Sequence, residues 1–513
     1  MARLFEYQAK KLLAEKKIPI PKGKVCKTPD EAKSAAEEIG KPVVVKAQLW
    51  VTGRKSIGGV RFAETPSQAA AETKALIGLR VKNFSVLEVL VEEKLDIASE
   101  MYAGIIIDDA NKRPLLIFSS VGGTGIEEIA REHPDKLIKH PIDIRLGLRD
   151  FEARNLVRSL GIHGNLQTNI ADVLTKLYDV AKTYEARSIE VNPLIVTKDE
   201  KAIAADCHMA VDDYAVFRHP ELGIEVAREL DHPLTELERI AYRVESKDYR
   251  GTFYFFQMET GFKKGEGCIG FHGAGGGGSM MSMDAVLSKG FKIANYTDCS
   301  GNPPASKVYR AAKIILQQPN LDGYFASGSG VASQEQFHSA RGFVKAFREM
   351  NLSIPAVIRL GGNQEEKAME ILGKYCSDLP AKLEAYGKDD SAVSCAERLR
   401  ALVDEGDIKT NVKVKPISNP DTPAQPYSFD SMTGKLTFDH AKCLKCEAKP
   451  CIDACIQKIL SAKQTDGGTV VELNITPDDA KKGKCTECLA CEIECWANAL
   501  NAIKIELPIE GLG

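Results

Sequence analysis

Eight of the fourteen cysteines of this 513-residue chain lie between residues 443 and 495. They form two groups of four. The first group has the spacing C-x2-C-x4-C-x3-C and the second has the spacing C-x2-C-x2-C-x3-C. Thiolates are soft, polarizable ligands, and thiolates that are closely spaced on a short loop can bind one metal centre together. The C-terminal segment is therefore predicted to fold around metal.

The spacing of the second group is the one that binds a cubane iron–sulfur cluster in bacterial ferredoxins, and the first group differs by two extra residues before its third cysteine. In ferredoxins with two clusters, the fourth cysteine of each group binds the cluster of the other group. The resemblance therefore implies one 4Fe–4S cluster held by Cys443, Cys446, Cys451 and Cys495, and a second held by Cys485, Cys488, Cys491 and Cys455.

We thus expect a small α+β ferredoxin-like domain at residues 437–507 that transfers electrons. Structural zinc also accepts four thiolates, and disulfides are a further alternative. Neither alternative is favoured, because two zinc sites would not require the C-x3-C ending twice.

Length, charge and hydropathy restrict the remaining possibilities. At about 150 residues per domain, 513 residues predict three or four domains, and 44% apolar with 27% charged residues is ordinary globular composition. A net charge of −3 gives no reason to expect a nucleic acid or a membrane surface as partner. The N-terminal residues carry charges throughout, and no run approaches the roughly 18 apolar residues of a membrane span. With its scattered remaining cysteines, the chain is expected to be cytoplasmic.

Short β-branched runs alternate with helical patterns from residue 1 to about residue 225. Strands are predicted at residues 41–47, 86–92, 102–108, 115–119 and 189–196, and a helix at 28–39 begins with proline and acidic residues, as helix N-termini do.

A second α/β region is predicted at residues 240–407. Its candidate parallel strands (GCIGF, GFKIANY, DGYFASG and IPAVIRL) alternate with helices, which predicts a doubly wound, flavodoxin-like sheet. Residues 408–436 are rich in proline and are predicted to be a linker to the cysteine motifs.

Seven short motifs in the first 200 residues occur in the order found in one known family. They are LFEYQAK at residues 4–10, VKAQ at 45–48, GR at 53–54, GGV at 58–60, LVE at 90–92, DIASEMY at 96–102 and EVNPL at 190–194. In this order they resemble the β subunit of succinyl-CoA synthetase, an acid–CoA ligase with an ATP-grasp domain that forms a nucleoside diphosphate. The resemblance extends over about residues 1–405.

The resemblance implies a site for ATP or GTP with Mg²⁺. Lys46, Gly53 and Arg54 would bind phosphates, Glu92 and Leu95 would lie by the base, and Glu100 would accept from the ribose. Asn192 and Asp206 would bind Mg²⁺ through hard oxygen ligands, and Glu190 would orient a histidine of a partner subunit. Taken singly, each has an ordinary alternative: Lys46 could be a surface lysine, and Asp206 a solvated strand end.

Two glycine-rich loops follow strands of the second region and precede helices, which is the geometry of an anion site. They contain His272 in the first loop and Gly328, Ser329 and Gly330 in the second, and the resemblance implies that they face the phosphorylated histidine and the organic acid. Alternatively, the glycines only permit tight turns. His272 stands where the family usually has asparagine, and it could itself accept a phosphoryl group.

The loops also depart from the family. Asp206 is followed by Cys207 and His208 instead of Gly and Lys, and the glycine-rich stretches near residues 300–303 and 326–330 are changed. Nucleotide use is therefore better supported than succinate as the acid.

The expected function is that of a nucleotide-binding ligase subunit acting on CoA and a carboxylic acid. It would work with an α-type CoA-binding subunit that carries the phosphohistidine, and the iron–sulfur domain would connect it to a redox partner. The alternative is an electron-transfer or scaffold subunit whose ATP-grasp domain is regulatory or inactive.

Overall fold

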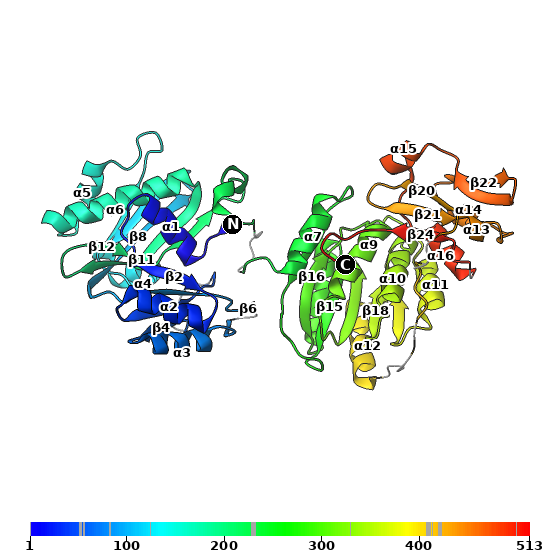
Figure 1. Ribbon diagram of the computed structural model, residues 1–513, viewed down its shortest axis with the longest axis horizontal. Helices are drawn as coiled ribbons and strands as arrows, with labels where there is room; N and C mark the ends of the chain where they lie inside the picture. The colour runs from blue at the N-terminus through cyan, green and yellow to red at the C-terminus, as the bar shows by residue number, and fades with distance from the viewer. Residues whose placement is uncertain are drawn as a thin grey trace. The chain divides into compact units, whose positions relative to one another are not determined.

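The computed structural model describes residues 2–50, 54, 57–81, 84–123, 125–226, 232–328, 330–406, 412, 414–418, 423–498 and 500–512. The chain forms two compact units, Met1–Leu234 and Thr235–Gly513 (Figure 1). The predicted nucleotide-binding region lies in the first unit. The predicted CoA-ligase and ferredoxin-like regions lie together in the second unit, so the sequence boundary between them does not separate two compact bodies.

Two antiparallel sheets form the first unit. The smaller sheet has the order β2-β7-β3-β4 and is covered by α2 (Pro29–Ile39) and α3 (Pro66–Leu76). Threonines cap both helices, because the Oγ of Thr28 and of Thr65 accepts from the amide three residues on. The strands are β2 (Gly23–Cys26), β3 (Val43–Ala47), β4 (Val60–Ala63) and β7 (Val89–Glu93).

The larger sheet has the order β1-β13-β11-β8-β9-β10, with β12 paired to β11. Its core packs against α1 (Glu6–Glu15) and α6 (Gly164–Thr183). Two further helices of this unit are α4 (Ile126–Glu132) and α5 (Asp150–Ser159). The strands are β1 (Ala2–Arg3), β8 (Ile97–Asp108), β9 (Arg113–Ser119), β10 (Leu137–Pro141), β11 (Ala186–Thr197), β12 (Ala202–Ala204) and β13 (His208–Val211). A two-stranded ribbon of β5 (Arg80–Val81) and β6 (Phe84–Ser85) completes the unit.

The second unit contains a mostly parallel sheet of order β14-β16-β15-β17-β18-β19, in which only β14 is antiparallel to its neighbour. Numbered from β15, the parallel strands follow the order 2-1-3-4-5, which is the flavodoxin-like order expected from the sequence. The strands are β14 (Tyr254–Gln257), β15 (Cys268–Ala274), β16 (Lys292–Asp298), β17 (Gly323–Gly328), β18 (Ala356–Arg359) and β19 (Leu383–Tyr386).

Helices cover both faces of this sheet. One face packs against α8 (Gly276–Ser288) and α12 (Ala392–Glu405). The other packs against α7 (Glu236–Ser246), α9 (Ala305–Ile315), α10 (Phe337–Glu349) and α11 (Glu365–Cys376).

The cysteine-rich segment forms a three-stranded sheet, a hairpin and short helices. The sheet has the order β20-β21-β24, and β22 pairs with β23. The elements are β20 (Pro426–Asp430), β21 (Lys435–Asp439), α13 (His440–Cys443), α14 (Pro450–Ala454), β22 (Leu460–Thr465), β23 (Gly468–Leu473), α15 (Pro477–Asp479), α16 (Ala490–Ala497) and β24 (Ile503–Glu506).

The predicted linker at residues 408–436 is therefore too long. Its last part already forms β20 and the start of β21, where Phe429 and Leu436 are buried on one face of the hairpin. The strand pattern of alternating polar and apolar residues is short there and directly follows several prolines. The proline content therefore predicted a linker and not a strand. Before it, Ile417 is also fully buried.

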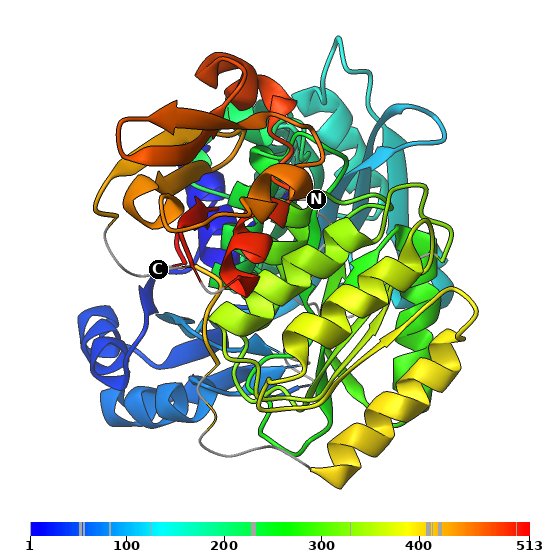
Figure 2. The same ribbon diagram turned by 90° about the vertical axis from the view of Figure 1, so that its right-hand side faces the viewer.

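The cysteine-rich segment and the CoA-ligase part share one hydrophobic core. Helix α16 lies against α10 in both ribbon views, as red beside yellow-green in Figure 2. Between the two helices, Lys345 of α10 is fully buried and its Nζ lies 2.8 Å from a carboxylate oxygen of Glu492 of α16. Ser418 joins this ion pair by donating to Glu492. The contact holds the cysteine-rich segment firmly on the flavodoxin-like sheet.

Within the described part of the chain, no helix has both the length and the apolar character that a membrane crossing requires.

Candidate functional site

A cavity of about 610 Å³ lies between the two sheets of the first unit. Strands β3, β4 and β7 form one wall, and β8, β11 and β13 form the other. The cavity brings together most of the residues predicted for nucleotide and metal binding: Lys46, Arg54, Glu92, Leu95, Glu100, Glu190, Asn192 and Asp206. Gly53 lies outside the described residues.

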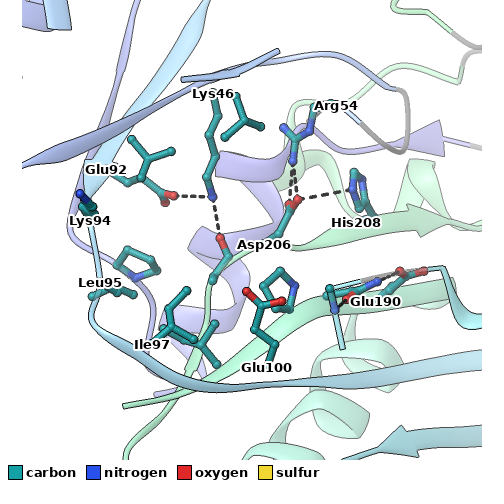
Figure 3. A pocket seen from close by; sticks show the side chains of 18 of the residues that line it. Lys46, Arg54, Glu92, Lys94, Leu95, Ile97, Glu100, Glu190, Asp206 and His208 are labelled. Carbon is teal, nitrogen blue, oxygen red and sulfur yellow. Dashed lines mark hydrogen bonds and ion pairs between the residues drawn. The ribbon is translucent and has the colours of Figure 1, made fainter. Parts of the chain in front are cut away.

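One end of the cavity holds cations that face carboxylates (Figure 3). The Nζ of Lys46 lies 2.8 Å from Glu6 and 2.9 Å from Glu92. The Nη2 of Arg54 lies 2.7 Å from both carboxylate oxygens of Asp206 and also 2.7 Å from Glu6. Both cations can therefore exchange a carboxylate for a phosphate oxygen at the same place.

A third cation, Lys10, lies beneath this end of the cavity and is 2% exposed. Its Nζ contacts Glu6 and both oxygens of Glu92 at 2.7 Å. Three cations thus face three carboxylates, and their charges balance. The cations are Lys10, Lys46 and Arg54, and the carboxylates are Glu6, Glu92 and Asp206. Lys10 and Glu6 were not among the site residues predicted from the sequence. A signal was present, since a Glu–Lys pair at positions 6 and 10 shares one helix face with the buried Leu13.

The buried ion pairs keep Glu6 and Lys46 charged. Burial alone would raise the pKa of Glu6, but Arg54, Lys10 and Lys46 hold that pKa well below its ordinary value. Burial would likewise lower the pKa of Lys46, but Glu6, Glu92 and Asp206 outweigh it and raise the pKa. The end of the cavity is thus a preorganised cluster of full charges.

The other end of the cavity has apolar walls that suit a flat base. The walls come from Val44, Val60, Phe62, Ile97 and Ile195, and Glu93, Lys94 and Leu95 line the same end.

Leu95 and Glu92 both line the cavity. The Glu92 carboxylate is buried and points to Lys10 and Lys46, at the charged end.

The loop after β9 closes over Glu100. A Cβ on Gly122 would lie 2.3 Å from the carbonyl oxygen of Met101, and a Cβ on Gly123 would lie 2.1 Å from a carboxylate oxygen of Glu100. Gly123 also has a φ of +84°, which favours glycine. Its amide donates to the Oδ1 of Asn192 at 3.0 Å. These glycines allow the loop to lie directly on the site.

Glu190 and Asn192 lie on β11 at the side of the cavity. The Nδ2 of Asn192 donates to Glu190 at 3.4 Å. Burial raises the pKa of Tyr102, and the carboxylate of Glu190, which accepts its hydroxyl hydrogen, raises it further. Tyr102 and Asn192 therefore orient the Glu190 carboxylate from two sides.

The side chains of Asn192 and Asp206 line the same cavity and offer hard oxygen donors, which fit Mg²⁺. The Asp206 carboxylate is bound to Arg54 and also accepts from the amide of Cys207 at 2.7 Å. His208 follows, with its Nε2 3.8 Å from Asp206. His208 lines the edge of this charged end.

The second unit gathers four loops at the carboxyl edge of its parallel strands. Asp298 accepts from the amides of Gly275 and Ser300, both at 2.9 Å, and so joins the loops after β15 and β16. Arg359 donates to the carbonyl oxygen of Gly328 at 3.2 Å and to that of Asp390 at 2.6 Å.

Gly330 packs beside this guanidinium, because a Cβ on it would lie 3.1 Å from the Nη2 of Arg359. Gly328 and Gly330 thus lie at this edge, while Ser329 lies outside the described residues. Arg359 was not among the residues predicted from the sequence.

His272 does not lie in a loop. It is part of β15, is 2% exposed, and its Nδ1 lies 2.6 Å from the Tyr324 hydroxyl while its Nε2 lies 3.3 Å from the Cys299 sulfur. Burial lowers the pKa of His272 to about 3 and raises the pKa of the Cys299 thiol. The expectation that His272 faces a substrate or accepts a phosphoryl group does not agree with this neutral, buried position.

This burial predicts an acid sensitivity of the second unit. An unfolded histidine binds a proton near pH 6.5, whereas folded His272 remains neutral down to about pH 3. The free energy of unfolding should therefore be constant above pH 7 and fall by about 2 kcal/mol between pH 7 and pH 5 from this group alone. The free energy of unfolding of His272→Asn, measured with urea, should fall less between pH 7 and pH 5 than that of the unaltered protein. Equal slopes for the two proteins would contradict the assignment.

The eight C-terminal cysteines form two groups in space. Burial, together with the neighbouring thiols of Cys495, Cys443 and Cys446, raises the pKa of Cys451 to about 12. These four thiols line one small cavity.

Burial also raises the pKa of Cys491, with additional increases from Cys488, Cys485, Cys451 and Cys455. Among the described residues, no three His, Cys, Asp or Glu side chains converge tightly enough to hold a single metal ion. The ligands at the corners of a cubane cluster stand farther apart than those of one ion.

Known families match the first unit and the flavodoxin-like part of the second unit. Residues 3–196 match the family model of the ATP-grasp domain, and residues 263–398 match the model described as ATP citrate lyase citrate-binding. Neither model includes the cysteine motifs.

The chain is 42% identical over 383 residues to the GDP-forming succinate–CoA ligase β subunit of Thermus thermophilus, covering 74% of this chain and 96% of that protein. It is 36% identical over 372 residues to the ADP-forming β subunit of Ignicoccus hospitalis, covering 72% and 93%. The structure of ATP citrate lyase from Methanothrix soehngenii, in complex with citrate and coenzyme A, has the same fold. Its TM-score is 0.54 at 18% identity, covering 78% of this chain and 99% of that one.

The fold and the charged cavity define an ATP-grasp protein of the nucleotide-dependent acid–CoA ligases. Within that class, the chain belongs to the family of succinate–CoA ligase β subunits.

Proposed function

We propose that the protein is the nucleotide-binding subunit of an acid–CoA ligase that works with an α-type subunit. The observation that carries the proposal is the charged end of the cavity, where Lys46 and Arg54 are held by carboxylates that a triphosphate can replace. Charges that converge in a cleft are typical of functional sites.

The reaction proceeds in three transfers. A histidine nitrogen of the partner attacks the γ-phosphorus of the nucleotide, so that a P–N bond forms and the diphosphate leaves. A carboxylate oxygen of the acid then takes the phosphoryl group and releases the histidine. Finally the thiolate of CoA attacks the acyl phosphate, forming the C–S bond and releasing phosphate. Lys46 and Arg54 stabilise the charge on the phosphoryl group in the first transfer.

Lys10 makes this exchange of partners possible. When Lys46 and Arg54 move to phosphate oxygens, Glu6 and Glu92 lose their contacts with these two cations. Both carboxylates still contact Lys10 at 2.7 Å, so neither is left as an unpaired buried charge. Mg²⁺ bound by Asn192 and Asp206 would offset further phosphate charge.

Glu190 is the residue we assign to the partner histidine. Its carboxylate is fixed by Tyr102 and Asn192 at the side of the cavity. A carboxylate that accepts the hydrogen of one imidazole nitrogen fixes the neutral tautomer in which the other nitrogen carries a lone pair. Glu190 would therefore keep one nitrogen of the histidine free to attack.

We place the acid at the loops on the carboxyl edge of the second unit's sheet, around Gly328 and Gly330. Both the succinate of the related ligases and the citrate of the matching family model carry more than one carboxylate. We therefore propose an acid with at least two carboxylates. Arg359 braces the loop through its contact with the carbonyl oxygen of Gly328 and does not itself offer a free guanidinium.

Mixing the chain with an α-type subunit and γ-labelled nucleotide tests this division of roles. The label should appear on a histidine of the α-type subunit and not on the isolated chain. Glu190→Gln should slow the labelling by about 100-fold or more, because the carboxylate acts on the imidazole, while nucleotide affinity stays nearly unchanged. Glu93→Gln, in the same cavity near the base, serves as the matched control. Equal labelling rates for both variants would contradict the role of Glu190.

We further propose that the cysteine-rich segment binds two 4Fe–4S clusters and exchanges electrons with a redox partner. The support is the grouping of the thiols, since Cys495 joins the first three cysteines of the other motif at one cavity. The amide of Ala502 donates to the Cys495 sulfur at 3.1 Å, as amides do to ligating sulfurs. Such clusters supply one-electron transfer.

Anaerobically purified protein should contain about eight iron and eight sulfide per chain, with brown absorbance that bleaches on reduction. Because the fourth ligands cross over, Cys495→Ser should reduce the content of the cluster bound by Cys443, Cys446 and Cys451. Cys376→Ser, a buried cysteine outside both groups, is the control. Zinc without sulfide would contradict the proposal.

A further inference from the structure

Three cations of α10 face α16 at successive helical turns. Lys345 pairs with Glu492 at 2.8 Å, and the guanidinium carbon of Arg348 lies 4.3 Å from the ring centre of Trp496. From the first contact to the second, the residue number rises by three on α10 and by four on α16, so the two helices run in the same direction here. One turn before Lys345 is Arg341, which lines one cavity with Glu494 of α16 and with Ala454. Glu494 lies one turn after Cys491, and Ala454 directly precedes Cys455, so Arg341 lies beside the segments that carry two of the four ligands of the second group.

The charged groups that act on Arg341 agree with this position of its side chain. Burial lowers the pKa of Arg341, and the groups that oppose this effect are Cys488, Glu494, Cys491 and Tyr375. The guanidinium also lies 4.8 Å over the ring of Phe337. Two of the four groups that act on Arg341 are thus cysteines of the second motif.

Arg341 is 7% exposed, and its Nη1 has no hydrogen-bond partner among the described residues. A buried cation is costly unless a nearby negative charge compensates it. Cysteines that bind an iron–sulfur cluster do so as thiolates, and the net charge of a cluster with its ligands helps to set its reduction potential. Glu494 is the one carboxylate among the four groups that act on Arg341, and the thiolates of Cys488 and Cys491 would be the further negative groups beside it.

We infer that Arg341, although it belongs to the CoA-ligase part, is the counter-charge of the cluster bound by Cys485, Cys488, Cys491 and Cys455. This inference rests on the proposed cluster binding. Reduction adds one electron from an external donor to the cluster. A fixed positive charge nearby favours the added electron, so Arg341 raises the reduction potential of this cluster relative to the same cluster without it.

Redox titration with dithionite, followed by visible absorbance and electron paramagnetic resonance, tests the inference on the full-length chain. In Arg341→Met, one of the two transitions should move to lower potential. We expect the equilibrium constant for reduction to fall about tenfold, which is about 59 mV for a one-electron couple. The other transition should stay in place. Lys289→Met removes a charge from α8 on the opposite face of the sheet and should move neither transition.

Arg341→Lys separates charge from packing. It retains the positive charge and should keep the transition near its original potential with full iron content. If Arg341→Lys shifts the potential or loses iron as much as Arg341→Met does, the residue acts through packing and the inference is wrong. If neither variant shifts a transition, it is also wrong. Absence of iron and sulfide from the unaltered chain would instead contradict the proposed cluster binding itself.

Discussion

Lys46→Ala should remove nearly all of the stabilisation that Mg-ATP or Mg-GTP gives to the first unit. At a nucleotide concentration of 100 times the dissociation constant, binding stabilises a protein by about 2.7 kcal/mol. If the affinity falls about 100-fold, the gain at the same concentration is only about 0.4 kcal/mol. The loss is large because Lys46 supplies one of the two cations that phosphate can reach.

Thermal unfolding with and without nucleotide measures this effect. Lys24→Ala removes an exposed lysine that pairs with Glu38 and should keep the full nucleotide response. If the unaltered, cluster-loaded protein shows no response to either nucleotide, the ligase proposal is wrong. The electron-transfer or scaffold subunit would then explain the chain better.

Lys345→Met should destabilise the second unit by about 3–5 kcal/mol, because it leaves the Glu492 carboxylate buried without its cation. Adding Glu492→Gln should recover more than half of this loss, since the fully buried carboxylate is then neutral. Glu349, the other carboxylate that pairs with Lys345, still lies 3.6 Å from Lys313. Lys313→Met, whose pair with Glu349 is longer at 3.6 Å and partly exposed, should cost about 1 kcal/mol or less.

The two tryptophans of the chain lie in different units, so the measurement can be made specific. In a Trp50→Phe background, denaturant unfolding followed by the fluorescence of Trp496 reports on the second unit alone. If the single and double variants are equally unstable, Lys345 contributes mainly through packing and not through its charge.

The sequence predicted the elements with strong local patterns. Strand β3 and helix α2 lie within two residues of their expected bounds, because a β-branched run and a capped, proline-led start are local signals. Strand β8 begins at Ile97, five residues earlier than expected, because its first four residues are exposed and show no alternation.

The candidate site was predictable where one motif fixes one residue. Lys46 and Glu190 came from such motifs, and both line the cavity. The partners of these residues were not predictable, because contacts such as Lys10 with Glu92 join residues far apart in the chain. His272 was misplaced for a related reason: glycines after a strand suggested a loop, but β15 continues to Ala274.

The shared core of the second unit has a consequence for biosynthesis. During translation, the first unit can fold once residues 1–234 have emerged, because its contacts are internal. The helices on the flavodoxin-like sheet need later parts of the chain. Lys345 pairs with Glu492, and Arg310 donates to the carbonyl oxygens of Thr433 and Pro508. If the cysteine-rich segment needs its proposed clusters in order to fold, chains made without iron would therefore lack a finished flavodoxin-like sheet as well.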